Sequence, residues 1–174
     1  NLDALQGLVS EVIVIVGFKK EMIIEEIGPK YGKLTIHYRE QKTQLGTGHA
    51  LQCVANLIKN KFVALGGDDI FSRKDIEACL KHKYAVLGCK VENPSRFGVF
   101  VLSGKEVRKV VEKPKTYVSD IANTGLYVFD KNVFKFKLKK SPRGEYEIID
   151  YINELVKEEK VVCEKVKGHW LSVG

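Results

Sequence analysis

The chain is poor in the residues that build membrane spans, disulfide frameworks or metal clusters. Its 174 residues include four cysteines, four prolines, one methionine and one tryptophan. No apolar run approaches the roughly 20 residues of a membrane-spanning helix, so we expect no membrane partner. Cys53, Cys79, Cys89 and Cys163 show neither a C-x-x-C pair nor a histidine at ligand spacing. This pattern argues against zinc and against disulfides, and it favours reduced thiols in a cytoplasm.

An initiator methionine is also missing. The sequence opens as NLDALQGLVSEVIVIVG, with Leu2, Leu5 and Leu8 already at helical spacing. We therefore expect a piece of a longer protein, truncated at the N-terminus and at the C-terminus. No Pro- or Gly-rich linker divides the chain, so we expect a single domain over residues 1–174. The hydrophobic share of 44% is sufficient for a sizeable core.

The formal net charge of +7 is concentrated in one short segment, DKNVFKFKLKKSPRG, at residues 130–144. Phe134 and Phe136 alternate with lysines there, a pattern that could serve nucleic acid. The segment is short and isolated, however. We prefer a solvated basic face whose phenylalanines point to the core, and we expect no nucleic-acid partner.

Apolar runs and helical patterns alternate over the first half of the chain. We predict strands at 11–16, 33–38 and 61–65, and helices at 18–28, 49–58 and 72–82, the last beginning with a Ser72–Asp75 capping box. Four strand-like runs follow between 84 and 130, then a helix at 144–160. This order predicts an α/β, Rossmann-like fold. We expect a central, mixed but mainly parallel sheet, helices on both faces and a small antiparallel extension.

Three segments are candidates for a ligand site, because ligands of open α/β sheets bind beyond the carboxyl ends of strands. They are the loop REQKTQLGTGH, the turn GGDD and the terminal HWLSVG. Gly46 would let a flat base approach the backbone closely, although a plain turn is the alternative. Asp68 could bind Mg²⁺ through its carboxylate, or could be an ordinary turn residue.

A dinucleotide-binding loop is a further alternative. Gly46-Thr47-Gly48 begins the G-x-G-x-x-G pattern, and Asp68 lies 20 residues past Gly48, where a ribose-binding acid is expected. Leu51 occupies the third glycine position, and the glycines do not follow the predicted strand directly. We consider this alternative the weaker one.

Four motifs, in this order, resemble those of the sugar-1-phosphate nucleotidyltransferases: QLGTGHA, GGDD after a strand, SRFGV…VVEKP, and ANTGLYVFD…RGEYEIID. The likeness covers nearly the whole chain. The sequence is similar above all to uridylyltransferase and thymidylyltransferase domains that precede a left-handed β-helix. The fold implied is the Rossmann-like nucleotide-diphospho-sugar transferase fold.

The resemblance implies a role for particular residues of this sequence. The family's base-binding and ribose positions correspond to Gln41, Gly46, Thr47 and Gly67. Asp68 corresponds to the aspartate that binds Mg²⁺, and Lys113 to a lysine near the sugar phosphate. Together, Asp68 and Lys113 are the implied catalytic residues. The family's sugar-binding positions correspond to Gly98, Glu112 and Asn123.

The sequence departs from the family pattern in three places. The glycine-rich loop that opens the family's domain, with its Arg and later Lys, is not in this sequence. Ser172 stands where the family usually has a second metal-binding Asp or Asn, and Ile149 replaces a common Thr. We expect the present stretch to be inactive by itself.

The activity implied joins a sugar 1-phosphate, of glucose or N-acetylglucosamine, to UTP or dTTP, and gives an NDP-sugar and pyrophosphate. The expected partners are these small molecules, with Mg²⁺ as cofactor and homo-oligomers formed through a C-terminal region outside this sequence. A non-catalytic nucleotide-sugar-binding subunit on the same fold is the alternative, and a GDP-mannose pyrophosphorylase is a more distant one.

Overall fold

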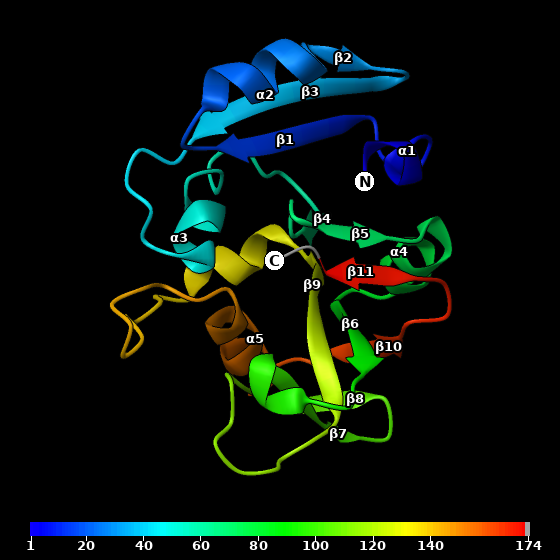
Figure 1. The fold of residues 1–174 in the computed structure, drawn as a ribbon, viewed down its shortest axis with the longest axis vertical. Coiled ribbons are helices and arrows are strands. Elements are labelled where there is room, and N and C mark those ends of the chain that lie inside the picture. The colour runs from blue at the N-terminus through cyan, green and yellow to red at the C-terminus, as the bar shows by residue number, and fades with distance from the viewer. Residues whose placement is uncertain (173–174) are drawn as a thin grey trace.

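The computed structural model describes residues 1–172 (Figure 1). In that part of the chain, no helix is both long and apolar enough to cross a bilayer. A short helix, α1 (Leu2–Leu5), comes first, and a small sheet of order β1-β3-β2 follows. β1 (Glu11–Val16) pairs in parallel with β3 (Leu34–Glu40), whose other edge pairs with β2 (Lys30–Tyr31) in antiparallel orientation.

The connection from β1 to β3 is α2 (Lys20–Ile27), which lies along this sheet in Figure 1. The predicted glycine C-cap is confirmed: Gly28 has a φ of 69°, and its N–H donates to the Ile24 carbonyl at 2.9 Å. A residue with a Cβ would be strained in this left-handed conformation, so the glycine ends the helix at low cost.

A six-stranded sheet of order β4-β9-β6-β10-β8-β7 forms the larger part of the molecule. Its strands are β4 (Phe62–Leu65), β6 (Ala85–Lys90), β7 (Val99–Ser103), β8 (Glu106–Val111), β9 (Ile121–Phe129) and β10 (Val162–Lys165). Because β7 also pairs with β9, five of the six strands close into a small barrel.

The prediction of a mainly parallel sheet is wrong. Within residues 1–172, only β1–β3 and β6–β10 pair in parallel, whereas every other ladder is antiparallel. The long strand β9, expected in the small antiparallel extension, lies instead between β4 and β6 and pairs antiparallel with both. A strand's apolar pattern indicates burial but not the direction of its neighbours, which the crossovers decide.

Helices cover both faces of this sheet, as predicted, and each face has its own core. α4 (Arg73–Leu80) buries Ile76 and Cys79 in one core. The other core contains residues of α3 (Thr47–Gln52) and α5 (Ile149–Leu155). Neighbouring residues of β6 alternate between them, since Val86 belongs to the second core and Leu87 to the first.

The basic segment at 130–144 begins with a 3₁₀ turn (Lys131–Lys135); another (Pro94–Arg96) precedes β7. Phe134 stacks on Phe62, with ring centroids 5.9 Å apart, and makes an edge contact with Tyr151. Phe136 packs against the same core. These contacts confirm that the phenylalanines of the basic run face inward.

A two-stranded sheet lies beside the barrel, formed by β5 (Asp69–Phe71) and β11 (Trp170–Ser172) in antiparallel pairing. Asp75, in the first turn of α4, fixes the chain that leads into β11. Its buried carboxylate accepts hydrogen bonds from the Ser72 hydroxyl at 2.6 Å and from the amides of Lys167 and Gly168 at 2.9 Å. The predicted capping box therefore also anchors the end of the described chain.

We predict that Asp75→Ala lowers the free energy of unfolding by about 2–4 kcal/mol, because two amides and a hydroxyl lose their acceptor inside the protein. Glu77→Ala is the matched control on the same helix, since Glu77 forms only an exposed ion pair with Arg73. We expect this change to cost about 0.5 kcal/mol. Urea denaturation measures both. Equal losses would contradict the anchoring role of Asp75.

Candidate functional site

The loop that contains QLGTGHA is held by its own polar side chains. Gly46 precedes α3 with a φ of 98°, and its carbonyl accepts a hydrogen bond from Gln41 Nε2 at 3.0 Å. The same nitrogen lies 2.9 Å from His49 Nδ1. Thr47 Oγ1 accepts from the Ile148 amide at 3.0 Å. Three residues predicted to hold the base are therefore neighbours in the fold.

The glycines of this loop are required first of all by the chain's own packing. A Cβ on Gly46 would lie 2.6 Å from the Tyr146 carbonyl oxygen, and one on Gly48 would lie 2.9 Å from the Glu147 backbone. Two hydrogen bonds join the segments: Gly48 N–H to the Tyr146 carbonyl at 2.7 Å, and Tyr146 N–H to the Leu45 carbonyl at 2.8 Å. Base binding at Gly46 stays a prediction, but close approach of residues 145–148 already explains the missing side chains.

The three predicted sugar-binding residues lie together. A Cβ on Gly98 would be 2.8 Å from Glu112 Oε2 and 3.7 Å from Asn123 Cβ. The Asn123 amide donates to the Gly98 carbonyl at 2.7 Å, and its Nδ2 donates to the Tyr127 hydroxyl at 2.7 Å. The Asn123 Oδ1 accepts from the Gly125 amide at 3.2 Å and keeps a second lone pair. The Glu112 carboxylate and the Asn123 side chain thus border the bare backbone of Gly98, a suitable lining for a polyol.

Lys113 follows Glu112 in an unusual backbone conformation. Its φ is 39°, one of two positive values at non-glycine residues in the described chain. Its amide donates to the Phe97 carbonyl at 3.1 Å, which ties the start of the β8–β9 connection to the approach to β7. Left-handed backbone at a residue with a Cβ costs about 1–2 kcal/mol, and such strain is concentrated at functional sites.

The turn GGDD adjoins the same strand that carries Asn123. The Gly66 amide donates to the Gly125 carbonyl at 3.0 Å, and a Cβ on Gly125 would lie 3.2 Å from Asp69 Oδ2. Gly67 and Asp68 are exposed. Strand β9 therefore contributes Asn123 to the sugar-binding residues and contacts the aspartate turn through Gly125, two positions further along the strand.

The oxygen atoms around this turn fit a hard divalent cation. A Cβ on Gly66 would lie 3.1 Å from Asp69 Oδ2 and 3.3 Å from Asp68 Oδ1, so two carboxylates border a space that only glycine leaves open. The described residues include no group of three His, Cys, Asp or Glu that could hold a metal. In proteins, Mg²⁺ usually takes one or two carboxylates and completes its octahedron with water and substrate phosphates.

Ser172 stands opposite Asp69 in the β5–β11 ladder, beside these carboxylates. Burial raises the pKa of Asp69, the hydrogen bond with Ser172 lowers it, and the charge of Asp68 raises it further. Ser172, which the resemblance gives as a departure from the usual Asp or Asn, thus lies beside the aspartate turn.

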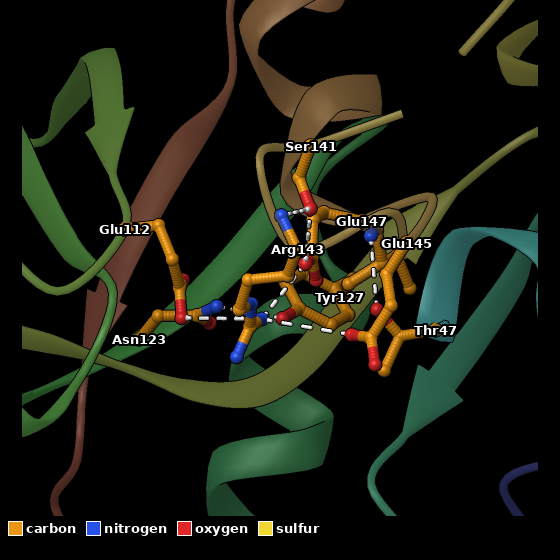
Figure 2. Close-up of polar contacts among 9 residues, drawn as sticks. Thr47, Glu112, Asn123, Tyr127, Ser141, Arg143, Glu145 and Glu147 are labelled. Atoms are coloured by element: carbon orange, nitrogen blue, oxygen red, sulfur yellow. Dashed lines mark hydrogen bonds and ion pairs between the residues drawn. The ribbon is translucent and has the colours of Figure 1, made fainter. Parts of the chain in front are cut away.

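Sequence reasoning missed a cluster of charges around Arg143 (Figure 2). Arg143 Nη2 lies 2.7 Å from Glu147 Oε1, 3.8 Å from Glu145 Oε2 and 3.9 Å from Glu112 Oε1. In the sequence, Arg143 belongs to the basic segment 130–144 and begins the motif RGEYEIID, and neither pattern assigns it a partner. The signal available was the spacing R-G-E-x-E, which places two acids two and four residues after the arginine.

Comparison of the sequence with known proteins identifies the family. The sequence model for the nucleotidyl transferase family covers residues 3–174. The chain belongs to the nucleotidyl transferase family. A relative in Haloferax volcanii, the UTP–glucose-1-phosphate uridylyltransferase AglF, is 32% identical over 99% of this chain and 76% of its own length.

Other members of the family are also similar to this chain over nearly its whole length. The bifunctional protein GlmU of Methanocaldococcus jannaschii is 39% identical over 99% of this chain, which spans only 42% of that relative. A crystal structure of a putative glucose-1-phosphate thymidylyltransferase from Bacillus anthracis, in complex with a sucrose, superposes with a TM-score of 0.85 at 29% identity. The match covers 98% of this chain and 74% of that protein. Membership of the family confirms the resemblance and the mixed α/β nucleotidyltransferase fold.

We predict that Gly46→Ala destabilises the fold by about 2–5 kcal/mol, since it combines left-handed strain with a backbone clash. Gly104→Ala is the control. Gly104 has a φ of 62° and open space where its Cβ would be. Strain alone should cost about 1–2 kcal/mol there. Thermal or urea unfolding distinguishes the two. Losses of equal size would show that residues 145–148 do not press against this loop.

Proposed function

We propose that this protein is a sugar-1-phosphate nucleotidyltransferase that joins glucose 1-phosphate or N-acetylglucosamine 1-phosphate to UTP or dTTP. The observation that supports this most directly is the placement along β9. Asn123 borders Glu112 and Gly98, and Gly125 borders the aspartate turn. One strand thus joins a polyol lining to a pair of carboxylates suited to a metal–phosphate group.

The proposed reaction requires no protein nucleophile, because the sugar phosphate provides one. A phosphate oxygen of the sugar 1-phosphate attacks the α-phosphorus of the nucleotide in line. The new O–P bond forms as the bond from the α-phosphorus to the bridging oxygen breaks, and pyrophosphate leaves with that electron pair. The task of the protein is therefore to position two anions and to neutralise their charge.

The site must neutralise the repulsion between two anionic substrates. Two unit charges 4 Å apart repel by about 1 kcal/mol in water and by roughly four times as much near a protein surface. Asp68, with Asp69 beside it, would hold Mg²⁺, which would supply positive charge to offset that of the phosphates. Lys113 would hold the phosphate of the sugar as a point charge. Gln41, Gly46, Thr47 and Gly67 would hold the nucleoside.

The sugar is recognised by groups that accept hydrogen bonds from hydroxyls. Burial raises the pKa of Glu112, the charge of Glu147 adds to this, and Arg143 and Lys113 oppose it. Its ionised form accepts hydroxyl hydrogen bonds, whereas protonation removes part of that capacity. Glu112 and Asn123 then select a hydroxylated ring, and Gly98, which leaves room for Glu112 Oε2, would contribute a backbone contact.

We predict that Asp68→Ala in the full-length protein lowers pyrophosphate release by about 100-fold or more, because the charge-stabilising cation loses a ligand. The fold should remain, since Asp68 is exposed. Asp120→Ala is the control: this carboxylate forms a surface ion pair with Lys90, and its loss should leave turnover unchanged. Near-normal turnover in Asp68→Ala would remove Asp68 from the mechanism.

A non-catalytic nucleotide-sugar-binding subunit is the second candidate, and Ser172 is the observation that favours it. A hydroxyl is a weaker Mg²⁺ ligand than a carboxylate, and it stands beside the aspartate turn. Pyrophosphate-release assays with UTP, dTTP and GTP, each with both sugar phosphates, distinguish the candidates. Binding without turnover under all conditions would favour the regulatory subunit, and turnover with GTP alone would favour a GDP-sugar pyrophosphorylase.

A further inference from the structure

The connection from β8 to β9 joins two of the residues assigned to the sugar. Glu112 directly follows β8, and Asn123 lies near the start of β9. Backbone hydrogen bonds fix both ends of this connection. The Lys113 amide donates to the Phe97 carbonyl at 3.1 Å, and the Asp120 carbonyl accepts at 2.9 Å from the amide of the residue that follows β6. The chain between these anchors therefore leaves from one sugar-binding residue and returns to another.

Residues 115–118 form a loose strap in the middle of this connection. They lie between two fixed points: Pro114, which is buried, and Ser119, whose hydroxyl accepts from the Ile121 amide at 3.2 Å. All four residues of the strap are exposed, and among the described residues no hydrogen bond or ion pair joins them to the rest of the chain. In Figure 1 the connection forms a wide arc that projects beyond the barrel. Few contacts and an exposed backbone are typical of segments that open and close at low cost.

The strap presents an aromatic ring to solvent beside the sugar-binding residues. Tyr117 is 76% exposed, and its neighbour Val118 is 38% exposed. A single exposed aromatic side chain is ordinary on a protein surface. Here, however, the ring is carried by an unattached segment whose two ends lead directly to Glu112 and Asn123. It is therefore placed to reach a ligand of those residues.

A cavity of about 200 Å³ lies between the strap and the 3₁₀ turn that precedes β7. Its lining consists of Asn93, Pro94, Ser95 and residues 114–117. Further along both segments, Gly98 and Glu112 belong to the sugar-binding group. Because the strap is not packed onto the turn, it can move without disturbing a close-packed core.

We propose that the strap is a lid, which closes over the bound sugar 1-phosphate and brings the ring of Tyr117 against the sugar. Tyr117 is then a further sugar-binding residue, beside Glu112 and Asn123. This inference rests on the proposed function, because it takes Gly98, Glu112 and Asn123 as the sugar site.

The lid supplies what the other sugar-binding residues lack. Glu112 and Asn123 offer polar atoms to hydroxyl groups, but a sugar ring also has apolar C–H faces. An aromatic ring covers such a face, and the tyrosine hydroxyl keeps a polar edge toward water. Closure also excludes water, which would otherwise compete with the sugar phosphate for the α-phosphorus.

Limited proteolysis of the full-length protein measures closure without requiring turnover. Trypsin cuts after Lys115, within the strap, but not after Lys113, because Pro114 follows it. Lys59, exposed between α3 and β4, is the internal reference. With saturating UDP-glucose, UDP-N-acetylglucosamine or dTDP-glucose and Mg²⁺, we expect the cut after Lys115 to slow by about tenfold or more, since cleavage follows the population of the open form. The cut after Lys59 should keep its rate.

Steady-state kinetics of the full-length protein test the ring itself. In Tyr117→Ala, we expect the KM for the sugar 1-phosphate to rise about tenfold, because the cover over the sugar is lost. The KM for the NTP should stay within about twofold. Tyr117→Phe keeps the ring and should remain close to the wild type. Leu57→Ala is the control, since Leu57 is an exposed apolar residue outside the strap and should be silent.

Calorimetry with the same nucleotide sugars separates the possible failures. If a nucleotide sugar binds and the cut after Lys115 slows no more than the cut after Lys59, the strap is not a lid and the inference is overturned. An unchanged KM for the sugar 1-phosphate in Tyr117→Ala overturns the role of the ring. If no nucleotide sugar binds the wild type, the proposed function is refuted, and the lid with it.

Discussion

The contact on which the site depends is the docking of residues 145–148 against the glycine loop. It is a backbone contact: the Tyr146 carbonyl lies 2.6 Å from the place of a Cβ on Gly46, and two main-chain hydrogen bonds fix the register. A side chain at 46 or 48 would force these segments apart. Because the docked segment continues into α5, the loop before α3 and the helix after the hairpin are held as one unit.

This contact connects the two halves of the proposed site. On one side, Gln41 and Thr47 hold the loop that would receive the nucleoside. On the other, the docked hairpin carries Arg143 to Glu112, which borders the sugar-binding backbone of Gly98. Strand β9 joins both to the aspartate turn. The proposed site therefore draws on three short loops that are distant in sequence.

Much of the secondary structure was predictable from the sequence, and the predictions that failed did so for physical reasons. The run EVIVIV predicted β1 because unbroken Val and Ile favour a strand, although only Val16 is fully buried, and Ser72 with Asp75 predicted the start of α4. The parallel sheet was wrong because apolar patterns carry no information about strand direction.

The glycines of QLGTGHA show a subtler limit. Sequence reasoning identified them as bare backbone and assigned the space to a base, whereas the Tyr146 carbonyl occupies it at Gly46. Which partner fills the space left by a missing Cβ depends on segments some 100 residues away. Arg143 was missed for the same reason: its partner Glu112 lies 31 positions earlier in the chain, beyond any local pattern.

The central claim is that the glycine loop, the aspartate turn and the Gly98–Glu112–Asn123 group form one site for a nucleotide-linked sugar. Titration of the ¹⁵N-labelled full-length protein with UDP-glucose, UDP-N-acetylglucosamine or dTDP-glucose in the presence of Mg²⁺ tests it most directly. The account predicts that the amide signals of Gly46, Gly67, Gly98 and Asn123 shift together with a single dissociation constant. Shifts confined to one of the three groups, or signals that remain unchanged with every nucleotide sugar, would contradict it.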